Sequence, residues 1–188
     1  MIIFLRRPLI YNQAMPPALI ALSGKQYAGK DHVADWLLAR LPGYCKRPIA
    51  QAIKEVYAER HGLTLEELEA NKAEHRPALI ILGDWGRSQR PDYWLEQALA
   101  FKGPKIIPDL RLQREYALLR ERGAFILRVE AERQTRASRG RLVAETDRTE
   151  CDLDAMTDWD AVIHNNGDEA ELQARLESLL SQLEAIGG

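Results

Sequence analysis

Short apolar runs alternate along the chain with longer stretches whose apolar residues recur every three or four positions. The short runs are the strand candidates, at about 18–23, 44–46, 105–109, 124–129 and 161–165. The longer stretches are the helix candidates, at about 30–41, 49–60, 76–87, 92–99, 112–122 and 168–186, with a further helix opening at Thr64. Strands that alternate with helices build parallel βαβ units. The pattern therefore predicts an α/β fold of three αβα layers around a central, mostly parallel sheet.

Composition and charge are those of a soluble globular protein. Apolar residues make up 46% and charged residues 29% of the 188 positions, and the net charge of −2 argues against binding to a nucleic-acid polymer. Cys45 and Cys151 are isolated, which excludes a disulfide framework and favours a reducing, cytoplasmic location. No run approaches the roughly 18 apolar residues of a membrane helix. We expect residues 1–16 to be an extension and 17–188 to form one domain.

The first strand candidate runs directly into a loop that both begins and ends in glycine. Strand, loop and helix in this order form the setting of a phosphate-binding P-loop, in which backbone N–H groups and the helix N-terminus hold phosphates. The expected nucleotide-binding residues are Gly24, Lys25, Gln26, Tyr27, Ala28, Gly29, Lys30, Asp31 and His32. The alternative is a glycine turn before an ordinary helix. We favour a loop that binds ATP.

Two carboxylates are candidates for holding the Mg²⁺ that accompanies ATP. Asp31 stands where the common P-loop pattern has Ser or Thr, and a carboxylate can hold the metal directly or through water. Asp109 ends the strand at 105–109, whose carboxyl end should open onto the same crevice as the loop. The alternative for Asp109 is a cap on the following helix.

Phosphoryl transfer demands positive charge from several parts of the chain. Lys30, Asp109 and Arg111 are the expected catalytic residues, because Arg111 follows Asp109 at the same strand end. Arg76 and Arg87 lie in the helical region at about 44–103, where a small kinase binds its acceptor, although a lone arginine is more often a surface charge. Leu79, Ile80, Leu82 and Trp85 are the core candidates of that region.

Arginines are concentrated after the strand at 124–129. Six of them (Arg128, Arg133, Arg136, Arg139, Arg141 and Arg148) stand against four acids, and the stretch at about 130–154 is predicted to be a lid that closes over ATP. The alternative is an exposed helix with many ion pairs. His164 is expected to be a strand-end or core histidine, since a phosphate acceptor needs little help to lose a proton.

An ordered set of motifs over about 18–183 resembles the GKD-type P-loop kinases. This family includes phage and bacterial deoxynucleoside monophosphate kinases and animal-type phosphomevalonate kinases. The matching pieces are Gly29-Lys30-Asp31, Ala50-x-x-x-Lys54, Lys72 with Arg76, Leu82 to Arg87, Asp92-Tyr93-Trp94, Pro108-Asp109-x-Arg111, Glu150 to Asp154 and Asp158 to Gly167. Leu82 to Arg87 and Asp92 to Trp94 are similar to the deoxynucleotide branch. Glu150 to Asp154 is similar to the phosphomevalonate branch, from which Leu112 and the loop interior Lys25 to Ala28 depart.

The resemblance implies transfer of phosphate from ATP to a (deoxy)nucleoside monophosphate, with phosphomevalonate kinase as the second choice. It implies that Lys54, Arg76, Arg87 and Arg111 bind the acceptor phosphate, and that Arg136, Arg139 and Arg141 close over ATP and the acceptor. Tyr93 or Trp94 is expected to stack on a base, and the alternative is that either belongs to the core. The expected partners are ATP, Mg²⁺ and a small phosphorylated acceptor, and the chain is expected to be a monomer or homodimer. A protein of this fold that binds nucleotide without catalysis is the remaining alternative.

Overall fold

The computed structural model describes residues 16–186, without the side chains of Lys72 and Ala73. The predicted extension, residues 1–16, therefore lies almost wholly outside the described residues. The chain divides into two compact units, which we call the sheet unit (Met1–Lys46 with Gly103–Gly188) and the helical unit (Arg47–Lys102). Within 16–186, none of the helices has the length and apolar character that crossing a membrane requires.

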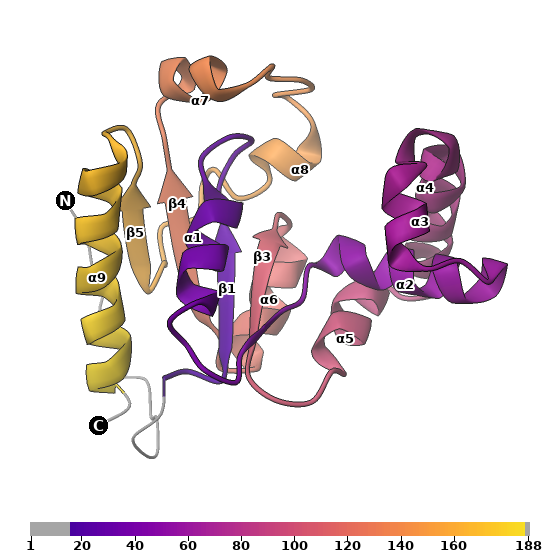
Figure 1. The fold of residues 1–188 in the computed structure, drawn as a ribbon, viewed down its shortest axis with the longest axis horizontal. Coiled ribbons are helices and arrows are strands. Elements are labelled where there is room, and N and C mark those ends of the chain that lie inside the picture. Colours follow the sequence, from indigo (N-terminus) through magenta and orange to yellow (C-terminus); the bar gives the residue numbers. More distant parts are fainter. Residues whose placement is uncertain (1–15, 187–188) are drawn as a thin grey trace. The chain divides into compact units, whose positions relative to one another are not determined.

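The described residues of the sheet unit form one sheet of five parallel strands. The strands are β1 (Leu19–Ser23), β2 (Cys45–Lys46), β3 (Lys105–Leu110), β4 (Phe125–Glu130) and β5 (Ala161–His164), in the spatial order β2-β3-β1-β4-β5. Figure 1 labels β1, β3, β4 and β5 of this sheet. The helices of this unit are α1 (Lys30–Leu38), α6 (Gln113–Glu121), α7 (Arg133–Arg139), α8 (Arg148–Cys151) and α9 (Glu169–Ile186). The predicted α/β class and parallel sheet are confirmed.

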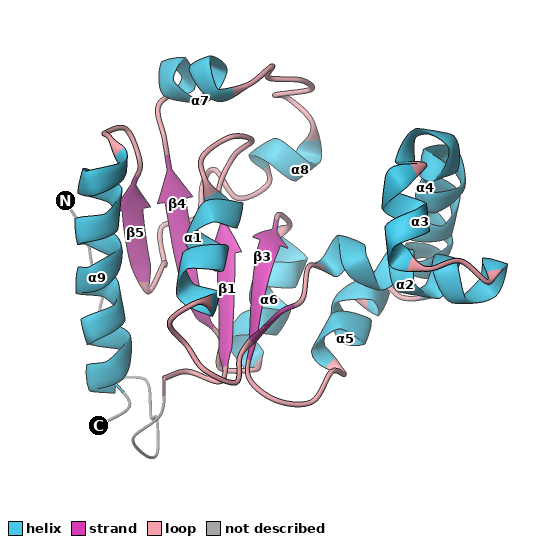
Figure 2. Ribbon diagram, in the orientation of Figure 1, coloured by secondary structure: helices cyan, strands magenta, loops and turns pink. Residues whose placement is uncertain are grey.

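Helices cover both faces of this sheet (Figure 2). On one face, Ile20 and Leu22 of β1 pack in a single cluster with Leu37 of α1 and Leu176 of α9. The alternate strand residues, such as Ala21, are equally buried on the other face, where α6 packs on β4. Burial on both faces explains why the strands read as continuous apolar runs rather than as alternating ones.

Strand β3 has an irregularity next to the predicted site. The pairing with β1 is regular as far as Ile107 and then shifts, so that Ser23 pairs with Leu110. Pro108 lies at the shift and has no N–H to donate to the ladder, which suits a bulge. The bulge changes the direction of the chain just before Arg111.

The helical unit contains α2 (Ile49–His61), α3 (Leu65–Ala70), α4 (Lys72–Gln89) and α5 (Tyr93–Leu99). Helix α2 ends at Gly62, whose φ of 66° is readily available to glycine. Helix α3 begins with a capping box, in which Thr64 and Glu67 satisfy each other's backbone N–H groups. Helix α4 begins four residues before the predicted start at Arg76 and includes Pro77.

Two of the core candidates on α4 were wrong. Ile80 is 53% and Trp85 is 40% exposed, whereas Leu82 is buried. The ring of Trp94 packs against Gly86, and its Nε1 donates to the Gly83 carbonyl oxygen at 2.9 Å. Gly83 and Gly86 therefore lie on the side of α4 that packs inward. Glycine does not contribute to an apolar pattern, so the pattern of the sequence predicted the wrong buried face.

Candidate active site

The loop between β1 and α1 has a backbone that requires glycine at both ends. Gly24 has φ 155° and Gly29 has φ 100°. A Cβ on Gly24 would collide with the Val129 carbonyl oxygen, and a Cβ on Gly29 would collide with the Asn165 amide nitrogen. Gly29 is also the N-cap of α1, so the unpaired N–H groups of the first helical turn open onto the loop. This is the backbone of an anion-binding loop.

The strand order places the ends of β1 and β3 at one crevice. The chain leaves β1 towards β2 on one side of the sheet and leaves β3 towards β4 on the other side. In such sheets the point where the connections diverge is the ligand crevice, beyond the carboxyl ends of the strands. The loop after β1 and Arg111 after β3 therefore meet, as the sequence predicts.

Lys30 is buried at this crevice. Its Nζ donates to the Lys25 carbonyl oxygen at 2.9 Å. The pKa of Lys30 is lowered to about 8, chiefly by burial and next by the Arg111 guanidinium, while Glu150 and Asp31 act in the opposite direction. An anion placed near this amine would therefore stabilise its charged form.

A buried carboxylate joins the loop to Arg111. Glu150 of α8 accepts from the Gln26 N–H at 2.9 Å and forms an ion pair with Arg111, while its side chain is 4% exposed. Lys25 forms an ion pair with Asp154 at 2.7 Å. Cations and carboxylates from three segments thus lie around the loop: the loop itself with the start of α1, the chain after β3, and residues 150–154.

Arg128 adds a further buried cation from β4. Its Nη1 donates to the Ser23 hydroxyl at 3.1 Å, and its guanidinium lies 5.3 Å from the Trp159 ring centroid. It also lies 3.8 Å from Asp154. The β1–β4 register places Ser23 and Arg128 opposite each other, so this contact follows from the sheet itself.

The predicted lid segment, 130–154, contacts the loop at several points. Arg136 and Arg139 approach the Gln26 and Tyr27 carbonyl oxygens at 3.4 Å, and the Gln26 side chain bonds to the Val143 backbone. Arg136 Nε is buried and, within the described part of the chain, has no hydrogen-bond partner. Arg141 is exposed. The segment forms the two short helices α7 and α8 with connecting loops, so the alternative of one exposed helix was wrong.

Asn165 ties this segment, the loop and β5 together. It is buried, its Nδ2 donates to the Ala28 carbonyl oxygen at 2.8 Å, and Arg139 donates to its Oδ1 at 3.2 Å. One amide side chain therefore holds both the loop and an arginine of the predicted lid segment.

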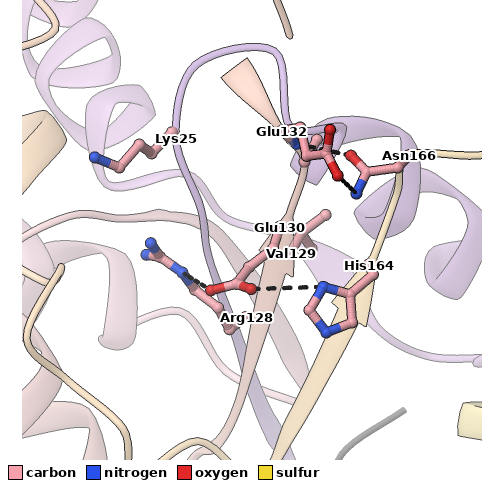
Figure 3. A pocket seen from close by; sticks show the side chains of 8 residues that line it. Lys25, Arg128, Val129, Glu130, Glu132, His164 and Asn166 are labelled. Atoms are coloured by element: carbon pink, nitrogen blue, oxygen red, sulfur yellow. Dashed lines mark hydrogen bonds and ion pairs between the residues drawn. The ribbon is translucent and has the colours of Figure 1, made fainter. Parts of the chain in front are cut away.

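Two pockets border the loop. One, of about 320 Å³, is lined by Lys25, Arg128, Glu130 and His164 among others. In Figure 3, Glu130 lies between Arg128 and His164. His164 ends β5 as predicted, and its Nδ1 is 3.6 Å from Glu130. The second pocket, of about 250 Å³, is lined by Gly29, His32, Arg139 and Asn165 among others. His32 is half exposed there and lies 3.0 Å from Glu169.

The two predicted Mg²⁺ ligands lie in different settings. Asp31 is 82% exposed and 3.0 Å from Lys46, whereas Asp109 is half-buried on β3, within the bulge. Among the described residues no three His, Cys, Asp or Glu side chains gather as a metal site. This donor set suits Mg²⁺ that arrives with ATP, because that ion uses only one or two carboxylates and takes its other ligands from phosphate and water. The assignment of Asp31 and Asp109 stays a prediction.

The remaining predicted acceptor residues belong to the helical unit. Lys54 forms an ion pair with Glu69, Arg87 pairs with Asp84 at 2.8 Å, and Arg76 is exposed. Tyr93 is half-buried with its ring edge to Trp85, at 5.6 Å between centroids. Trp94 is only 3% exposed, so its ring is enclosed in the unit. Their role in acceptor binding stays a prediction.

Sequence reasoning missed three members of the site. Arg128 was counted with the lid although it lies on β4, and a cation inside an apolar run was the available signal. Asn165 follows the last strand within a motif already noted. Glu150 stands in a noted family motif, but its contact with the loop could not be predicted, since only the fold brings α8 there.

The parallel sheet, the Gly24–Lys30 loop at its crevice and the surrounding cations define a kinase of the P-loop class. The phosphomevalonate kinase family model matches residues 22–124, more than half of the chain. The chain belongs to this family.

Individual relatives agree with this assignment. Phosphomevalonate kinase of Drosophila melanogaster is 28% identical over 183 residues, which cover 88% of this chain and 96% of that protein. Two solved structures share the fold at a TM-score of 0.50. They are shikimate kinase from Bacteroides thetaiotaomicron (15% identity, covering 88% of this chain and 97% of that one) and TT1252 from Thermus thermophilus (20% identity, 89% and 98%).

Proposed function

We propose that this chain transfers the terminal phosphoryl group of ATP to the phosphate of phosphomevalonate, giving ADP and the diphosphate. One observation carries the phosphoryl transfer: Lys30 and Arg111 from separate segments share a buried anion-binding position at the loop. The choice of acceptor rests on the family match, which spans both residues. Family membership thus reverses the order of the two acceptors that the sequence motifs favoured.

The loop N–H groups, the N-terminus of α1 and Lys30 hold the phosphates of ATP. Arg136 has a buried donor, Nε, that is available to an incoming phosphate. The pocket of Gly29, His32 and Arg139 lies beside the loop and receives the nucleoside part. Mg²⁺ bound with ATP neutralises charge on the phosphates, with Asp31 and Asp109 as the carboxylates that would hold it.

A phosphate oxygen of the acceptor attacks the γ-phosphorus. One P–O bond forms, the bond to the β-phosphate oxygen breaks, and ADP leaves with that electron pair. The acceptor oxygen is already ionised near neutral pH, so no side chain has to remove a proton. The work of the protein is to position the two phosphates and to offset their charge, for which Arg111 and Arg128 are placed.

A nucleoside monophosphate is the second candidate acceptor. The exposed indole of Trp85, with Tyr93 at its edge, is an aromatic surface on which a base could stack. Leu112 follows Arg111, and Lys25 is the only cation inside the loop before Lys30. Both features provide less charge than phosphomevalonate kinases place there.

The test is ADP release from Mg-ATP by the purified protein with single acceptors. Phosphomevalonate, deoxynucleoside monophosphates and ribonucleoside monophosphates are offered in turn, and Lys30→Ala protein reports contaminating kinases. Turnover with phosphomevalonate alone supports the proposal, and turnover with nucleotides alone replaces it with the second candidate. ATP binding without turnover on any acceptor would favour the non-catalytic alternative.

A further inference from the structure

The carboxylate of Glu150 occupies donors that a phosphate would use. Gln26 N–H belongs to the phosphate-binding loop, and it donates to Glu150 Oε2 at 2.9 Å. The other oxygen, Oε1, is paired with Arg111. A carboxylate and a phosphate oxygen bind such donors in the same way, by charge-assisted hydrogen bonds.

The charge of Glu150 is enclosed with the cations of the site. Its side chain is 4% exposed, and it acts electrostatically on Lys30 as well as on Arg111. A buried carboxylate persists only when it is paired and hydrogen-bonded, as it is here. A phosphate that reached the same N–H and guanidinium would lie beside this negative charge, and the two anions would repel each other strongly.

A second carboxylate of the same segment reinforces the arrangement. Asp154 holds Lys25 of the loop at 2.7 Å and lies 3.8 Å from Arg128. Between them, Asp152 anchors the segment to the start of α6 by accepting from the Gln113 N–H at 2.8 Å. The segment can therefore stay attached while the Glu150 side chain alone turns away.

We propose that Glu150 is a built-in competitor of phosphate, a carboxylate that must leave Gln26 and Arg111 before the phosphates can bind there. The inference rests on the proposed function, because it concerns the affinity of the same loop. It assigns Glu150 the role of setting that affinity: binding of the phosphates includes the cost of displacing a paired carboxylate. It also makes Arg111 available only when Glu150 has moved.

The test compares wild-type protein with Glu150→Gln by calorimetric titration at constant ionic strength. ATP is one probe, and inorganic tripolyphosphate, which has no base or sugar, is the other. Glutamine keeps the size and one acceptor but loses the charge, so both probes should bind about tenfold more tightly. Glu150→Ala removes the acceptor as well and should tighten binding in the same direction.

A matched control removes the same charge from the surface. Glu121 is exposed at the end of α6. Glu121→Gln should therefore leave both dissociation constants unchanged. Unchanged or weaker binding in both Glu150 variants, with cooperative unfolding retained, would overturn the role of Glu150 and leave the kinase proposal standing. Failure of wild type and variants alike to bind either probe would overturn both.

Discussion

Lys30 holds its charge beside two arginines in a buried position. Burial is the main reason that its pKa falls from the ordinary 10.5 to about 8, with Arg111 contributing next. Below about pH 8 the folded protein bears the cost of a buried cation, and this cost disappears between about pH 8 and 10.5, where only the unfolded chain keeps the proton. An incoming phosphate offsets the same cost, which makes Lys30 a strong contributor to phosphate binding.

Replacing Lys30 by alanine should lower turnover by about a hundredfold to a thousandfold, the usual effect of removing one transition-state donor. The variant should stay folded, because it loses a cation whose burial is unfavourable. ADP release and thermal unfolding measured on the same sample check this. Near-normal turnover would rule out the kinase assignment of the loop.

The affinity for ATP should fall as pH rises through about 8, because Lys30 loses its charge in the free protein. The dissociation constant measured from pH 7 to 9.5 should be flat at first and then rise. The phosphates of ATP are fully ionised across this range, since their last pKa is near 6. A dissociation constant that stays flat to pH 9.5 would contradict the lowered pKa of Lys30.

Arg111→Ala should slow turnover severely, and it should also destabilise the protein, because Glu150 would remain buried without its ion pair. Adding Glu150→Gln to this variant should restore stability but not turnover. Arg122→Ala removes an exposed arginine near the end of α6 and serves as the control. Kinetics of Arg111→Ala equal to those of the control would remove Arg111 from the site.

Residues within a contiguous motif could be predicted, whereas residues delivered by distant segments could not. Lys30 follows from the spacing of the glycines, and Arg111 from its place after a strand. Arg128 and Glu150 reach the loop only because β4 lies beside β1 and α8 folds back over the loop. The local spacing of apolar and polar residues predicts neither of these contacts.

At the scale of elements, the loop depends on β5 as much as on its own glycines. Asn165, just after β5, holds the Ala28 carbonyl and occupies the space beside Gly29. Hydrogen bonds of Asn165 thus join the loop to the end of β5 and to Arg139 of the predicted lid segment. A change in the loop, in β5 or at Arg139 should therefore change the affinity for the nucleotide.

Gly29→Ala tests this coupling, and Gly43→Ala is its matched control. Both glycines have positive φ, so each substitution costs about 1–2 kcal/mol of backbone strain. A Cβ at Gly43 meets nothing within 4 Å, whereas one at Gly29 collides with Asn165. Only Gly29→Ala should therefore weaken ATP binding, by about tenfold or more, as measured by titration. Equal affinities in the two variants would mean that Asn165 does not position the loop.

Element types could be predicted well, and the faces of the helices less well. Parallel strands buried on both sides gave clear apolar runs, so β1, β3, β4 and β5 were placed within a residue or two. Helix α4 was misread because Gly83 and Gly86, not large apolar residues, mark its inward side. A pattern of apolar positions does not reveal a contact in which a large side chain packs directly against a glycine.

At the scale of the molecule, the predicted ATP-binding residues lie in the sheet unit, whereas the predicted acceptor residues other than Arg111 lie in the helical unit. The loop and its arginines belong to the sheet unit, while Lys54, Arg76 and Arg87 belong to the helical unit. ATP should therefore slow amide hydrogen exchange at residues 24–30 and 136–139, and phosphomevalonate should slow it around 54, 76 and 87. Mass-spectrometric exchange with each ligand alone measures this. An acceptor that protects only the sheet unit would contradict the predicted acceptor site.

The central position of β1 determines when the sheet can form during synthesis. Of the strands in residues 16–186, Leu19–Ser23 leaves the ribosome first, yet its partners β3 and β4 follow the whole helical unit. At about 5–20 residues per second, several seconds separate β1 from β4. The contiguous helical unit can fold within that time, because its contacts are local in sequence. The nascent chain thus carries β1 as an unpaired apolar strand until β3 emerges and with one open edge until β4 follows, so the speed of translation governs its exposure to chaperones and to aggregation.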